Sequence, residues 1–363
     1  ALTRMNQPST MEEVGVLIRG EGAPILARGA GTKSALFSGG GEVEILDLSK
    51  FSGIVEYEPS EYVFTARAGT SLAEINEALL SNNHYLPFDP LLVDKGATLG
   101  GTVASGLSGP GMFRFGGIRD FIIGARFAIG SGKIVKGGGK VVKNAAGFDY
   151  PKFLVGSLGR FAVLLELTFK VFPRPDARLS LRFDSKNAAD SLEKLLFFSR
   201  SKWDIDALEL EAEGPLFLRL AGDSSGLRSR ADCIMRELGN GTILTEEQAF
   251  DYWAGISCFS WAGAQNSYAK VPISPRIIPR LDTAIEDLAI ERRYGMGGNV
   301  AWLSWSSDKV ALELELILKD LELSALVLRG EADTALIGHK KDFAIHALVK
   351  KAFDANGRFP DLP

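Results

Sequence analysis

The stretch KGATLGGTVASGLSGPGMFRFGGIRDFIIG, residues 95–124, decides how the first half of the chain is interpreted. Its apolar residues alternate as they do in a buried strand, yet glycines interrupt them repeatedly. Glycine weakens a strand and loses more conformational entropy on ordering than any other residue. The pattern therefore predicts that the backbone itself comes close to a partner.

Three glycine-rich loops follow one another in this half of the chain. In order they are Arg28-Gly29-Ala30-Gly31-Thr32-Lys33, then Thr98-Leu99-Gly100-Gly101-Thr102 with Ser105-Gly106-Leu107-Ser108-Gly109, and then residues 144–149 with 156–159. Backbone N–H groups in such loops can form a nest for an anion, and a pyrophosphate can be held there without burying an unpaired side-chain charge. One such loop is usually an ordinary turn. Three in order predict a dinucleotide site.

Two more familiar nucleotide motifs are excluded. The first loop begins like the dinucleotide fingerprint G-x-G-x-x-G, but Ser34 stands where the third glycine is needed, and no convincing helix follows. Gly130-Ser131-Gly132-Lys133 resembles the end of a phosphate-binding P-loop, but Ile134 replaces the Ser or Thr that would bind magnesium. We interpret the second motif as the turn of a hairpin.

Composition narrows the class of protein. The chain has 363 residues, which predicts two domains, and 46% of them are apolar and 24% charged, as in a globular protein. A formal net charge of −4 argues against a dedicated nucleic-acid binder, which would show a basic face.

The cysteine content and the hydropathy of the sequence indicate in which cellular compartment we expect the protein. Only Cys233 and Cys258 are present, which excludes a disulfide scaffold and a cysteine-ligated iron–sulfur or zinc site in this sequence and fits a reducing, cytosolic compartment. The longest apolar run, residues 153–172, contains Arg160, Glu166 and Lys170 and is a poor membrane span. We expect no secretory leader, although a start at Ala1 without an initiator Met leaves removal of an earlier segment open.

Periodicity predicts alternating strands and helices up to the proline-rich residues 171–179, which we expect to be a domain boundary. Ser71 and Glu74 form a capping box that opens a helix through about Asn82, and residues 125–138 predict a hairpin. Beyond the boundary we expect an antiparallel sheet covered by helices. Its predicted strands lie within 179–183, 206–211, 215–222, 266–273, 299–305 and 324–330, its predicted helices near 188–200, 225–238, 245–258, 277–289 and 309–321, and a helical tail over 340–357.

The ordered loops resemble the FAD-binding domain of the vanillyl-alcohol oxidase / para-cresol methylhydroxylase (PCMH-type) superfamily, over roughly residues 5–175. More narrowly, GAGTKSALF, GATLGGTVASGLSGP and KNAAGFDYPKFLVGS are similar to the FAD-binding E subunits of bacterial glycolate oxidases. The resemblance implies an α+β fold. It would consist of a PCMH-type FAD-binding domain of two α/β subdomains over 1–175, an α+β cap domain with an antiparallel sheet over 176–338, and a helical tail over 339–363 that returns toward the FAD domain.

The same resemblance implies roles for matching residues. Arg28 to Lys33 would surround the pyrophosphate, and Thr98 to Thr102 with Ser105 to Gly109 would contact the pyrophosphate, the ribityl chain and the flavin edge. Beneath the ring it places Arg114, Gly116, Gly117, Arg119 and Asp120; at the closing edge of the site, Lys143, Asn144, Gly147 and Asp149; and at the adenine, the backbone near Val163. The competing interpretation of Arg119 and Asp120 is a local ion pair that orients a strand.

Three departures from the superfamily pattern carry implications. Covalent members have a His in the first loop, which is missing here, so the resemblance implies non-covalent FAD. The relatives' His-x-Gly-Asp-Gly-Asn-x-His segment is absent, since the only histidines are His84, His339 and His346. The usual closing segment appears here as DANGRFPDLP, which lacks or displaces an Asn that relatives place near the flavin.

Oxidation of a 2-hydroxy acid needs a cation for the carboxylate, a base for the hydroxyl proton and a hydride acceptor, and a flavin supplies only the last. Candidate cations in the second domain are Lys270, Arg276 and Arg329, and candidate bases are His339 and Tyr294. Each such residue is more often part of a surface or core rim. The same holds for the aromatic residues that could stack over a flavin, namely Trp253, Trp302 and Trp305.

Three functional hypotheses stay open. In the first, the chain is an FAD-binding subunit of a glycolate (2-hydroxy acid) oxidase or dehydrogenase complex and takes part in electron transfer with a sister FAD subunit and an iron–sulfur subunit. That complex would lie in the cytoplasm or at the inner face of the membrane. In the second, the chain alone is an FAD-dependent dehydrogenase of a small hydroxy acid or alcohol. In the third, it is a structural subunit without cofactor. The missing cysteine cluster and histidine motif favour the first.

Overall fold

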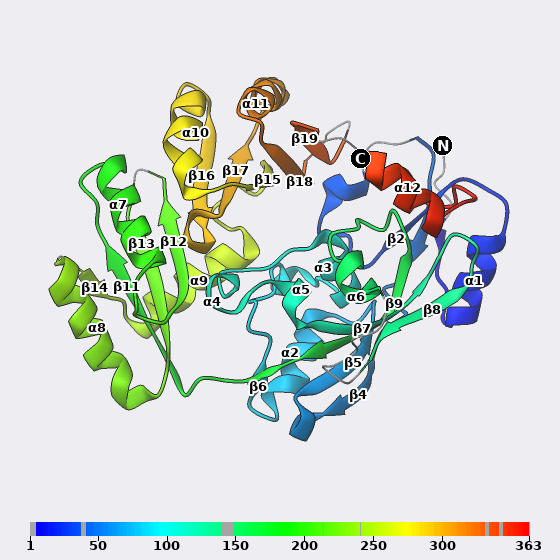
Figure 1. Ribbon diagram of the computed structural model, residues 1–363, viewed down its shortest axis with the longest axis horizontal. Coiled ribbons are helices and arrows are strands. Elements are labelled where there is room, and N and C mark those ends of the chain that lie inside the picture. The colour runs from blue at the N-terminus through cyan, green and yellow to red at the C-terminus, as the bar shows by residue number, and fades with distance from the viewer. Residues whose placement is uncertain are drawn as a thin grey trace.

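The computed structural model describes residues 5–37, 41–139, 148–212, 214–239, 241–330, 334–340 and 344–362. It has two lobes joined by the extended chain around residue 175 (Figure 1). We call residues 5–173 the N-terminal lobe and residues 177–338 the cap lobe. The α+β fold class is confirmed, and the predicted domain limits at 175 and 338 stay predictions.

The N-terminal lobe contains two main sheets. The first is parallel, in the order β1 (Met5–Asn6), β3 (Glu44–Asp47) and β2 (Ile25–Arg28). The second is antiparallel, in the order β4 (Ile54–Glu58), β5 (Val63–Arg67), β9 (Val163–Lys170), β7 (Ile122–Ala128) and β8 (Ile134–Gly138). A separate short pair joins β6 (His84–Tyr85) to β10 (Phe172–Pro173).

Short helices connect these strands. They are α1 (Met11–Arg19), α2 (Leu72–Leu80), α3 (Leu99–Ser105), α4 (Met112–Phe115), α5 (Ile118–Phe121) and α6 (Tyr150–Leu154), with 3₁₀ turns η1 (Ser34–Phe37), η2 (Pro59–Glu61) and η3 (Val93–Lys95). Ser71 caps α2 as predicted, since its side chain accepts the Glu74 N–H. The predicted hairpin is β7–β8, and its turn uses a positive φ at Gly132. Where a second glycine loop was predicted, the chain forms α3, because the Thr98 side chain accepts the Gly101 N–H at its start.

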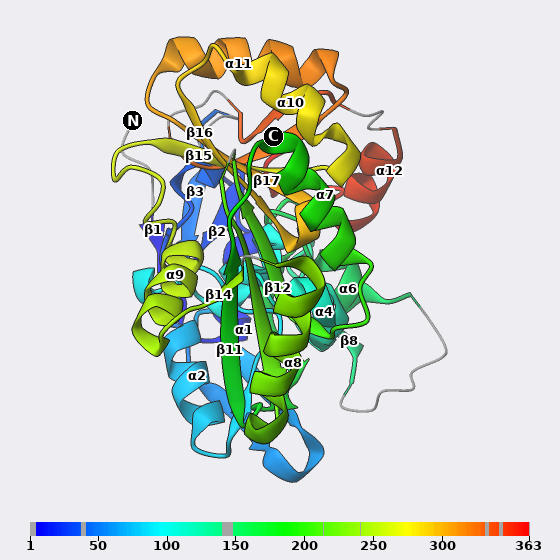
Figure 2. The same cartoon turned by 90° about the vertical axis from the view of Figure 1, so that its left-hand side faces the viewer.

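The cap lobe is one nine-stranded antiparallel sheet with helices on it. The strand order is β14 (Gly241–Ile243), β11 (Ala177–Phe183), β13 (Leu216–Gly222), β12 (Ile205–Glu211), β16 (Ile290–Gly295), β17 (Val300–Trp305), β15 (Ser267–Pro272), β18 (Ser324–Arg329) and β19 (Leu336–Gly338). The helices are α7 (Ala188–Ser199), α8 (Ser224–Leu238), α9 (Glu246–Cys258), α10 (Ile278–Ile285) and α11 (Asp308–Asp320), with 3₁₀ turns η4 (Pro275–Ile277) and η5 (Met296–Gly298). Figure 2 shows α7 and α8 on one side of strands β11–β13 and α9 on the other.

The predicted cap elements are confirmed with two differences. Strands β14, β16 and β19 were not predicted, and the helix predicted over 277–289 ends at Ile285. The missed strand β16, IERRYG, lacks the apolar alternation of a half-buried strand because three of its six residues are charged. This strand later proves to hold part of a pocket.

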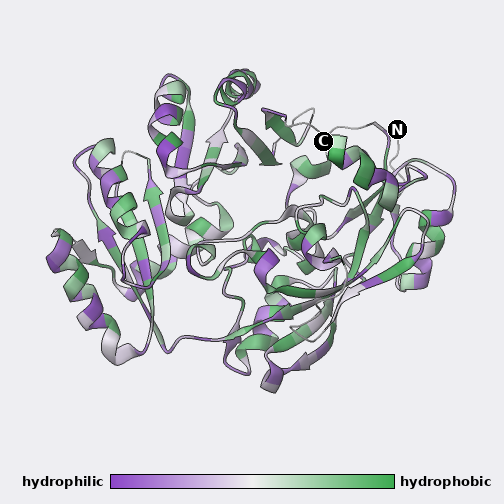
Figure 3. Cartoon of the chain, in the orientation of Figure 1, coloured by the Kyte–Doolittle hydropathy of each residue, from purple (hydrophilic) through white to green (hydrophobic). Residues whose placement is uncertain are grey.

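Apolar side chains from both lobes pack together. Strand β9 is buried over nearly its whole length, and Figure 3 shows the strands of its sheet in the hydrophobic colours while the outer helices α8 and α10 mix both kinds of residue. The core around β9 extends into the cap lobe through Phe259, Tyr268 and Trp302. The two lobes therefore share an apolar contact. No helix among the described residues is long and apolar enough to cross a bilayer.

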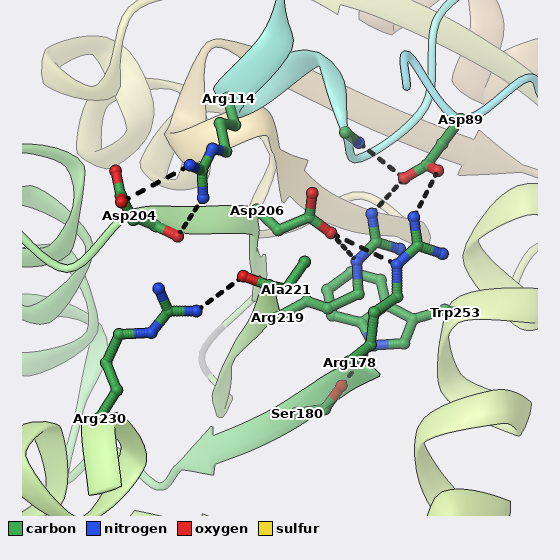
Figure 4. Close-up of polar contacts among 11 residues, drawn as sticks. Asp89, Arg114, Arg178, Ser180, Asp204, Asp206, Arg219, Ala221, Arg230 and Trp253 are labelled. Atoms are coloured by element: carbon green, nitrogen blue, oxygen red, sulfur yellow. Dashed lines mark hydrogen bonds and ion pairs between the residues drawn. The ribbon is translucent and has the colours of Figure 1, made fainter. Parts of the chain in front are cut away.

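Charged side chains also join the lobes (Figure 4). Asp89 of the N-terminal lobe contacts the guanidinium groups of Arg219 and Arg178, and both arginines also contact Asp206. Arg219 and Asp206 are almost fully buried. Helix α9 adds a backbone contact, from the Leu92 N–H to the Ser257 carbonyl at 2.8 Å.

The C-terminal segment packs on the N-terminal lobe. Helix α12 (Ala344–Phe353) is followed by residues whose backbone binds β2, through the Ile25 N–H and the Arg358 carbonyl at 2.7 Å. The Lys350 ammonium donates to the Arg160 carbonyl at 2.8 Å. The segment thus closes the parallel sheet of the N-terminal lobe.

Candidate functional site

A pocket opens between the two sheets of the N-terminal lobe. It encloses about 730 Å³, its open mouth included, which is within the usual range for small-molecule sites. Its wall combines the first glycine loop, the start of α3, the 158–162 segment and apolar side chains of the core. The lining residues are Leu26, Ala27, Arg28, Gly29, Ala30, Gly31, Thr32, Lys33, Leu36, Phe37, Leu48, Ala68, Thr98, Gly100, Gly101, Ala104, Leu158, Gly159, Ala162 and Leu164.

The loop of residues 29–33 supplies donors to this pocket. It follows β2 directly and leads into η1, and Gly31 turns it with a φ of +70°. None of its five amide groups donates a hydrogen bond to an atom of the described residues. Successive backbone N–H groups that lack acceptors make an anion-binding concavity. The first loop therefore has the properties of a phosphate cradle.

Two cations flank this loop. Lys33 is 6% exposed and lines the pocket, and within the described part of the chain it donates only to the neighbouring Thr32 hydroxyl, at 3.1 Å. Burial lowers the pKa of the Lys33 ammonium to about 8. Arg28 also lines the pocket and pairs with Asp47 at 3.1 Å. A bound anion would give the Lys33 ammonium a charge partner, which none of the described residues supplies.

The amides at the start of α3 are already occupied. The Gly100 N–H donates to the Ala68 carbonyl at 2.8 Å, and the Leu99 N–H donates to the Thr70 carbonyl at 2.9 Å. A Cβ on Gly100 would lie 2.7 Å from the Ala68 Cβ, so this glycine permits close packing of α3 against the end of β5. Gly100 and Gly101 form part of the pocket wall, but the sequence-based prediction of free amides does not hold here.

Most of the predicted flavin contacts after Gly101 do not line the first pocket. These predicted flavin contacts are Thr102, Ser105, Gly106, Leu107, Ser108 and Gly109. Their polar groups bind within the protein: the Ser105 hydroxyl donates to the Gly101 carbonyl at 2.7 Å, and the Ser108 hydroxyl accepts the Ile118 N–H at 2.9 Å. Of this group, Gly109 lines a second pocket.

The residues predicted beneath the ring are Arg114, Gly116, Gly117, Arg119 and Asp120, and none of them lines either pocket. Asp120 accepts the Gly117 N–H at 2.9 Å and so orders the turn before α5. Arg119 donates to the Lys152 carbonyl at 3.4 Å, and Arg114 reaches the cap lobe, where it binds Asp204.

The third predicted loop is described in part. Lys143, Asn144 and Gly147 lie outside the described residues. Asp149 caps α6 by accepting the Lys152 N–H at 3.2 Å, away from the pocket. The backbone at Val163 lies between Ala162 and Leu164, both of which line the pocket.

The second pocket lies between the lobes and encloses about 270 Å³. Three of its lining residues come from the N-terminal lobe and the others from the cap lobe, where α9, β12, β16 and β17 meet. They are Leu91, Gly109, Pro110, Glu209, Ile256, Phe259, Trp261, Arg293, Met296 and Trp302. Trp302, predicted as core or as a stacking residue, is 5% exposed here. Sequence analysis missed Glu209 and Arg293, because their strands carry no motif.

The candidate catalytic residues lie elsewhere. None of Lys270, Arg276, Arg329, His339 and Tyr294 lines either pocket. Arg329 donates to the carbonyls of Gly263 and Asn266, both at 2.6 Å, and Tyr294 donates to Asp282. Lys270 is paired across strands with Trp302, and burial lowers its pKa. Trp253 binds Ser180, and Trp305 belongs to the core of the cap lobe.

Comparison with known proteins decides the family. Residues 4–138 match the family described as FAD binding domain. The glycolate oxidase subunit GlcE of Escherichia coli (strain K12) is 34% identical over 292 residues, which cover 78% of this chain and 77% of that protein. The chain belongs to the GlcE family. FAD is its cofactor, and it is an FAD-dependent oxidoreductase of the glycolate oxidase type.

Other relatives match a smaller share of this GlcE-family chain. A D-lactate dehydrogenase of Archaeoglobus fulgidus is 30% identical over 175 residues, or 46% of this chain and 38% of that protein. The glycolate oxidase subunit GlcD of Bacillus subtilis (strain 168) is 29% identical over 161 residues, or 44% and 34%. A solved structure of alkyldihydroxyacetonephosphate synthase matches 98% of this chain and 75% of its own with a TM-score of 0.72 at 14% identity, which shows a shared fold.

The residues of the first pocket fit the diphosphate of FAD. The free amides of residues 29–33 and the buried Lys33 ammonium supply donors and positive charge, and the apolar wall contributed by Leu26, Leu48 and Leu164 suits a stacked or enclosed ring. FAD, when bound, supplies the two-electron acceptor of an oxidation.

Proposed function

We propose that this GlcE-family chain is the FAD-binding subunit of a glycolate (2-hydroxy acid) oxidase or dehydrogenase complex and takes part in flavin-mediated electron transfer. The observation that carries the proposal is the loop of residues 29–33, which lines one pocket with a buried lysine and with five amides that have no acceptor among the described residues. That arrangement suits a diphosphate. The substrate class, a 2-hydroxy acid, is inferred from the relationship to the glycolate oxidase subunit GlcE.

Non-covalent binding of FAD is part of the proposal. The residues that line the first pocket include no His and no Cys, the side chains that would form a bond to a flavin. Affinity would then come from the diphosphate contacts and the apolar wall. Denaturation should release all of the flavin into the supernatant.

Partners are also part of the proposal. The sequence has only two cysteines, so electrons that leave the flavin toward an iron–sulfur cluster must pass to another chain. We propose a sister FAD subunit, related to GlcD, and an iron–sulfur subunit as partners, with the complex in the cytoplasm or at the inner face of the membrane. The exposed apolar residues of α11 and α12, Leu312, Leu316, Ile345 and Leu348, are available for such contacts.

The alternative is that the chain oxidises a small hydroxy acid or alcohol without partners. One observation favours this alternative: the second pocket holds the Glu209 carboxyl and the Arg293 guanidinium. These are a base and a cation of the kind that the oxidation of a hydroxy acid requires beside the flavin.

One experiment separates these functions. The purified FAD-loaded chain is mixed anaerobically with glycolate and with D-lactate, and bleaching of flavin absorbance is followed, first alone and then with the sister and iron–sulfur subunits. Bleaching only with partners supports the proposal, and bleaching of the isolated chain supports the alternative. A chain that retains no FAD after purification in the presence of FAD contradicts both.

A further inference from the structure

The second pocket has the size and position of a small-molecule site. It lies where Gly109 and Pro110 of the N-terminal lobe meet the cap sheet. Its volume of about 270 Å³ includes the space that is open to solvent at its mouth. The pocket is therefore a small one, and it cannot hold a dinucleotide.

The register of the cap sheet brings a carboxyl and a guanidinium into this pocket. Glu211 of β12 is paired with Arg293 of β16, and Arg293 is paired with Trp302 of β17. Residues two apart on a strand share a face, so Glu209 and Gly295 lie on the same face as that row. A Cβ on Gly295 would lie 2.7 Å from Glu209 Oε2, so the glycine leaves the space that the Glu209 carboxyl occupies.

Arg293 is fixed in place but has unused donors. Its Nη2 donates to the Tyr252 hydroxyl at 2.7 Å and to Glu211 at 3.1 Å, and the guanidinium lies over the rings of Tyr252 and Trp261. Its Nε is buried and has no hydrogen-bond partner among the residues that the structure describes. A buried donor without an acceptor is costly, and an acceptor in the pocket would remove that cost. The Arg293 guanidinium is therefore held in a fixed position, and its Nε–H is available to an acceptor.

Glu209 is the second polar group of the pocket. It is 2% exposed, and its Oε1 accepts the Met296 N–H at 3.0 Å. Its Oε2 accepts no hydrogen bond from the described residues. Burial raises the pKa of this carboxyl to about 7. The hydrogen bond from the Met296 N–H and the charges of Arg293 and Arg219 act in the opposite direction and limit the rise. The group can thus accept or hold a proton near neutral pH.

We propose that this pocket binds a small 2-hydroxy carboxylate, with Arg293 on its carboxylate and Glu209 on its hydroxyl. Apolar side chains, among them Ile256, Phe259 and Trp302, form the remaining wall and leave Arg293 and Glu209 as its charged groups. The proposal rests on the proposed function for the substrate class. Glu209 accepts the hydrogen bond of the hydroxyl when it is ionised.

The direct test is titration calorimetry on the FAD-loaded chain with oxalate, which cannot be oxidised as a hydroxy acid, and with inorganic phosphate to detect a general anion site. Arg293→Met should weaken oxalate binding at least tenfold, and Arg293→Lys should restore part of the affinity because it keeps the charge. Arg228→Met removes a guanidinium that is 70% exposed on α8 and should leave the affinity unchanged. The flavin spectrum of each variant checks that the FAD site is intact.

The dependence of oxalate affinity on pH tests Glu209. The charged groups whose fields act on it are Arg293 and Arg219, which favour its ionised form, and Asp89, which opposes it. Oxalate lacks a hydroxyl, so an ionised Glu209 repels it, and affinity should fall as pH rises through about 7. Glu209→Gln should bind oxalate with a flat profile over the same range.

Several outcomes overturn the proposal. These are no binding of oxalate by the FAD-loaded wild type, equal affinity in Arg293→Met and wild type, phosphate binding as tight as oxalate binding, or an unchanged pH profile in Glu209→Gln. If any of these holds while glycolate still bleaches the flavin with partners present, the proposed function stands and this pocket is not its substrate site. If the chain retains no FAD, the proposed function itself fails.

Discussion

Two glycine-rich segments of the N-terminal lobe look alike in sequence and differ in the structure. In residues 29–33, no amide donates to the described protein, and the loop faces a pocket. In residues 100–117, the glycine amides donate to protein acceptors such as the Ala68 carbonyl and the Asp89 carboxylate. Glycine shows that a backbone approaches something closely, but the fold decides whether that is a ligand or the protein.

The second segment also connects to the cap lobe. Asp89 accepts the Gly111 N–H at 2.8 Å and binds Arg219, so the glycine turn and the cap sheet share one carboxylate. A Cβ on Gly111 would lie 2.1 Å from the Pro87 carbonyl oxygen. The first segment therefore keeps amides available to a ligand, the role that we propose for it, whereas the second connects the N-terminal lobe to the cap lobe.

The largest expected effect comes from Asp89→Ala. It leaves Arg219 buried with one partner fewer and removes the acceptor of Gly111, which should lower the free energy of unfolding by about 3–5 kcal/mol. Asp184→Ala is the matched control, because Asp184 pairs with Arg182 at the surface with its side chain 67% exposed and should cost less than about 1 kcal/mol. Urea unfolding measures both. Equal losses would mean that Asp89 has no special role in joining the lobes.

A pair of glycine variants tests the comparison directly. Gly100→Val places side-chain atoms against Ala68 and should lower the unfolding free energy of the FAD-free chain by about 1–3 kcal/mol. A Cβ on Gly31 would make only an ordinary contact, 3.7 Å from the Arg28 Cδ, but the φ of +70° makes Gly31→Val cost about 1–2 kcal/mol. The strain moves the amides, so FAD should bind about tenfold more weakly.

Urea unfolding of the FAD-free chain and FAD titration separate the two effects. We expect Gly100→Val to change unfolding more than FAD affinity, and Gly31→Val to show the opposite order. The reverse result would assign the cofactor to the second segment and the packing role to the first.

The smallest expected effect is the pH dependence of FAD affinity due to Lys33. Its pKa in the free chain is lowered to about 8, so the ammonium is charged below pH 8 and favours a bound diphosphate. Above pH 8 the lysine is neutral and must take up a proton on binding, so affinity should fall by up to about tenfold per pH unit. Fluorescence titration of FAD measures this.

Lys33→Met provides the control for that titration. It has no titrating group at this position, so its FAD affinity should be weaker at pH 7 and should not follow the wild-type decline above pH 8. A wild-type affinity that is constant between pH 7 and 9 would show that Lys33 does not face the diphosphate.

Much of the fold could be predicted from local pattern. The Ser71 cap, the β7–β8 hairpin and helices such as α7 and α9 follow from signals within a dozen residues. Strand β16 escaped because Glu291, Arg292 and Arg293 break the apolar pattern. Glu291 is exposed, and the partial burial of the two arginines depends on Asp282 and Glu211, which come from other elements.

The first glycine loop was found from sequence because its signal is contiguous: a short strand, two glycines and a cation within nine residues, 25–33. The second pocket was not found, since its groups are spread from Leu91 to Trp302 and none forms a motif. Catalytic groups that are spread along the chain without a motif can be chosen from sequence only by residue type. The catalytic candidates Lys270, Arg276, Arg329 and His339 were chosen in this way.

Sequence by itself determined the FAD-binding family and predicted the first glycine loop, because the residues of this loop are contiguous in the chain. Only the tertiary structure decided which glycines pack against Ala68 or Asp89, and that Glu209 and Arg293 meet in one pocket. Sheet register and the approach of the two lobes place those groups together, and both depend on contacts between residues that are far apart in the chain.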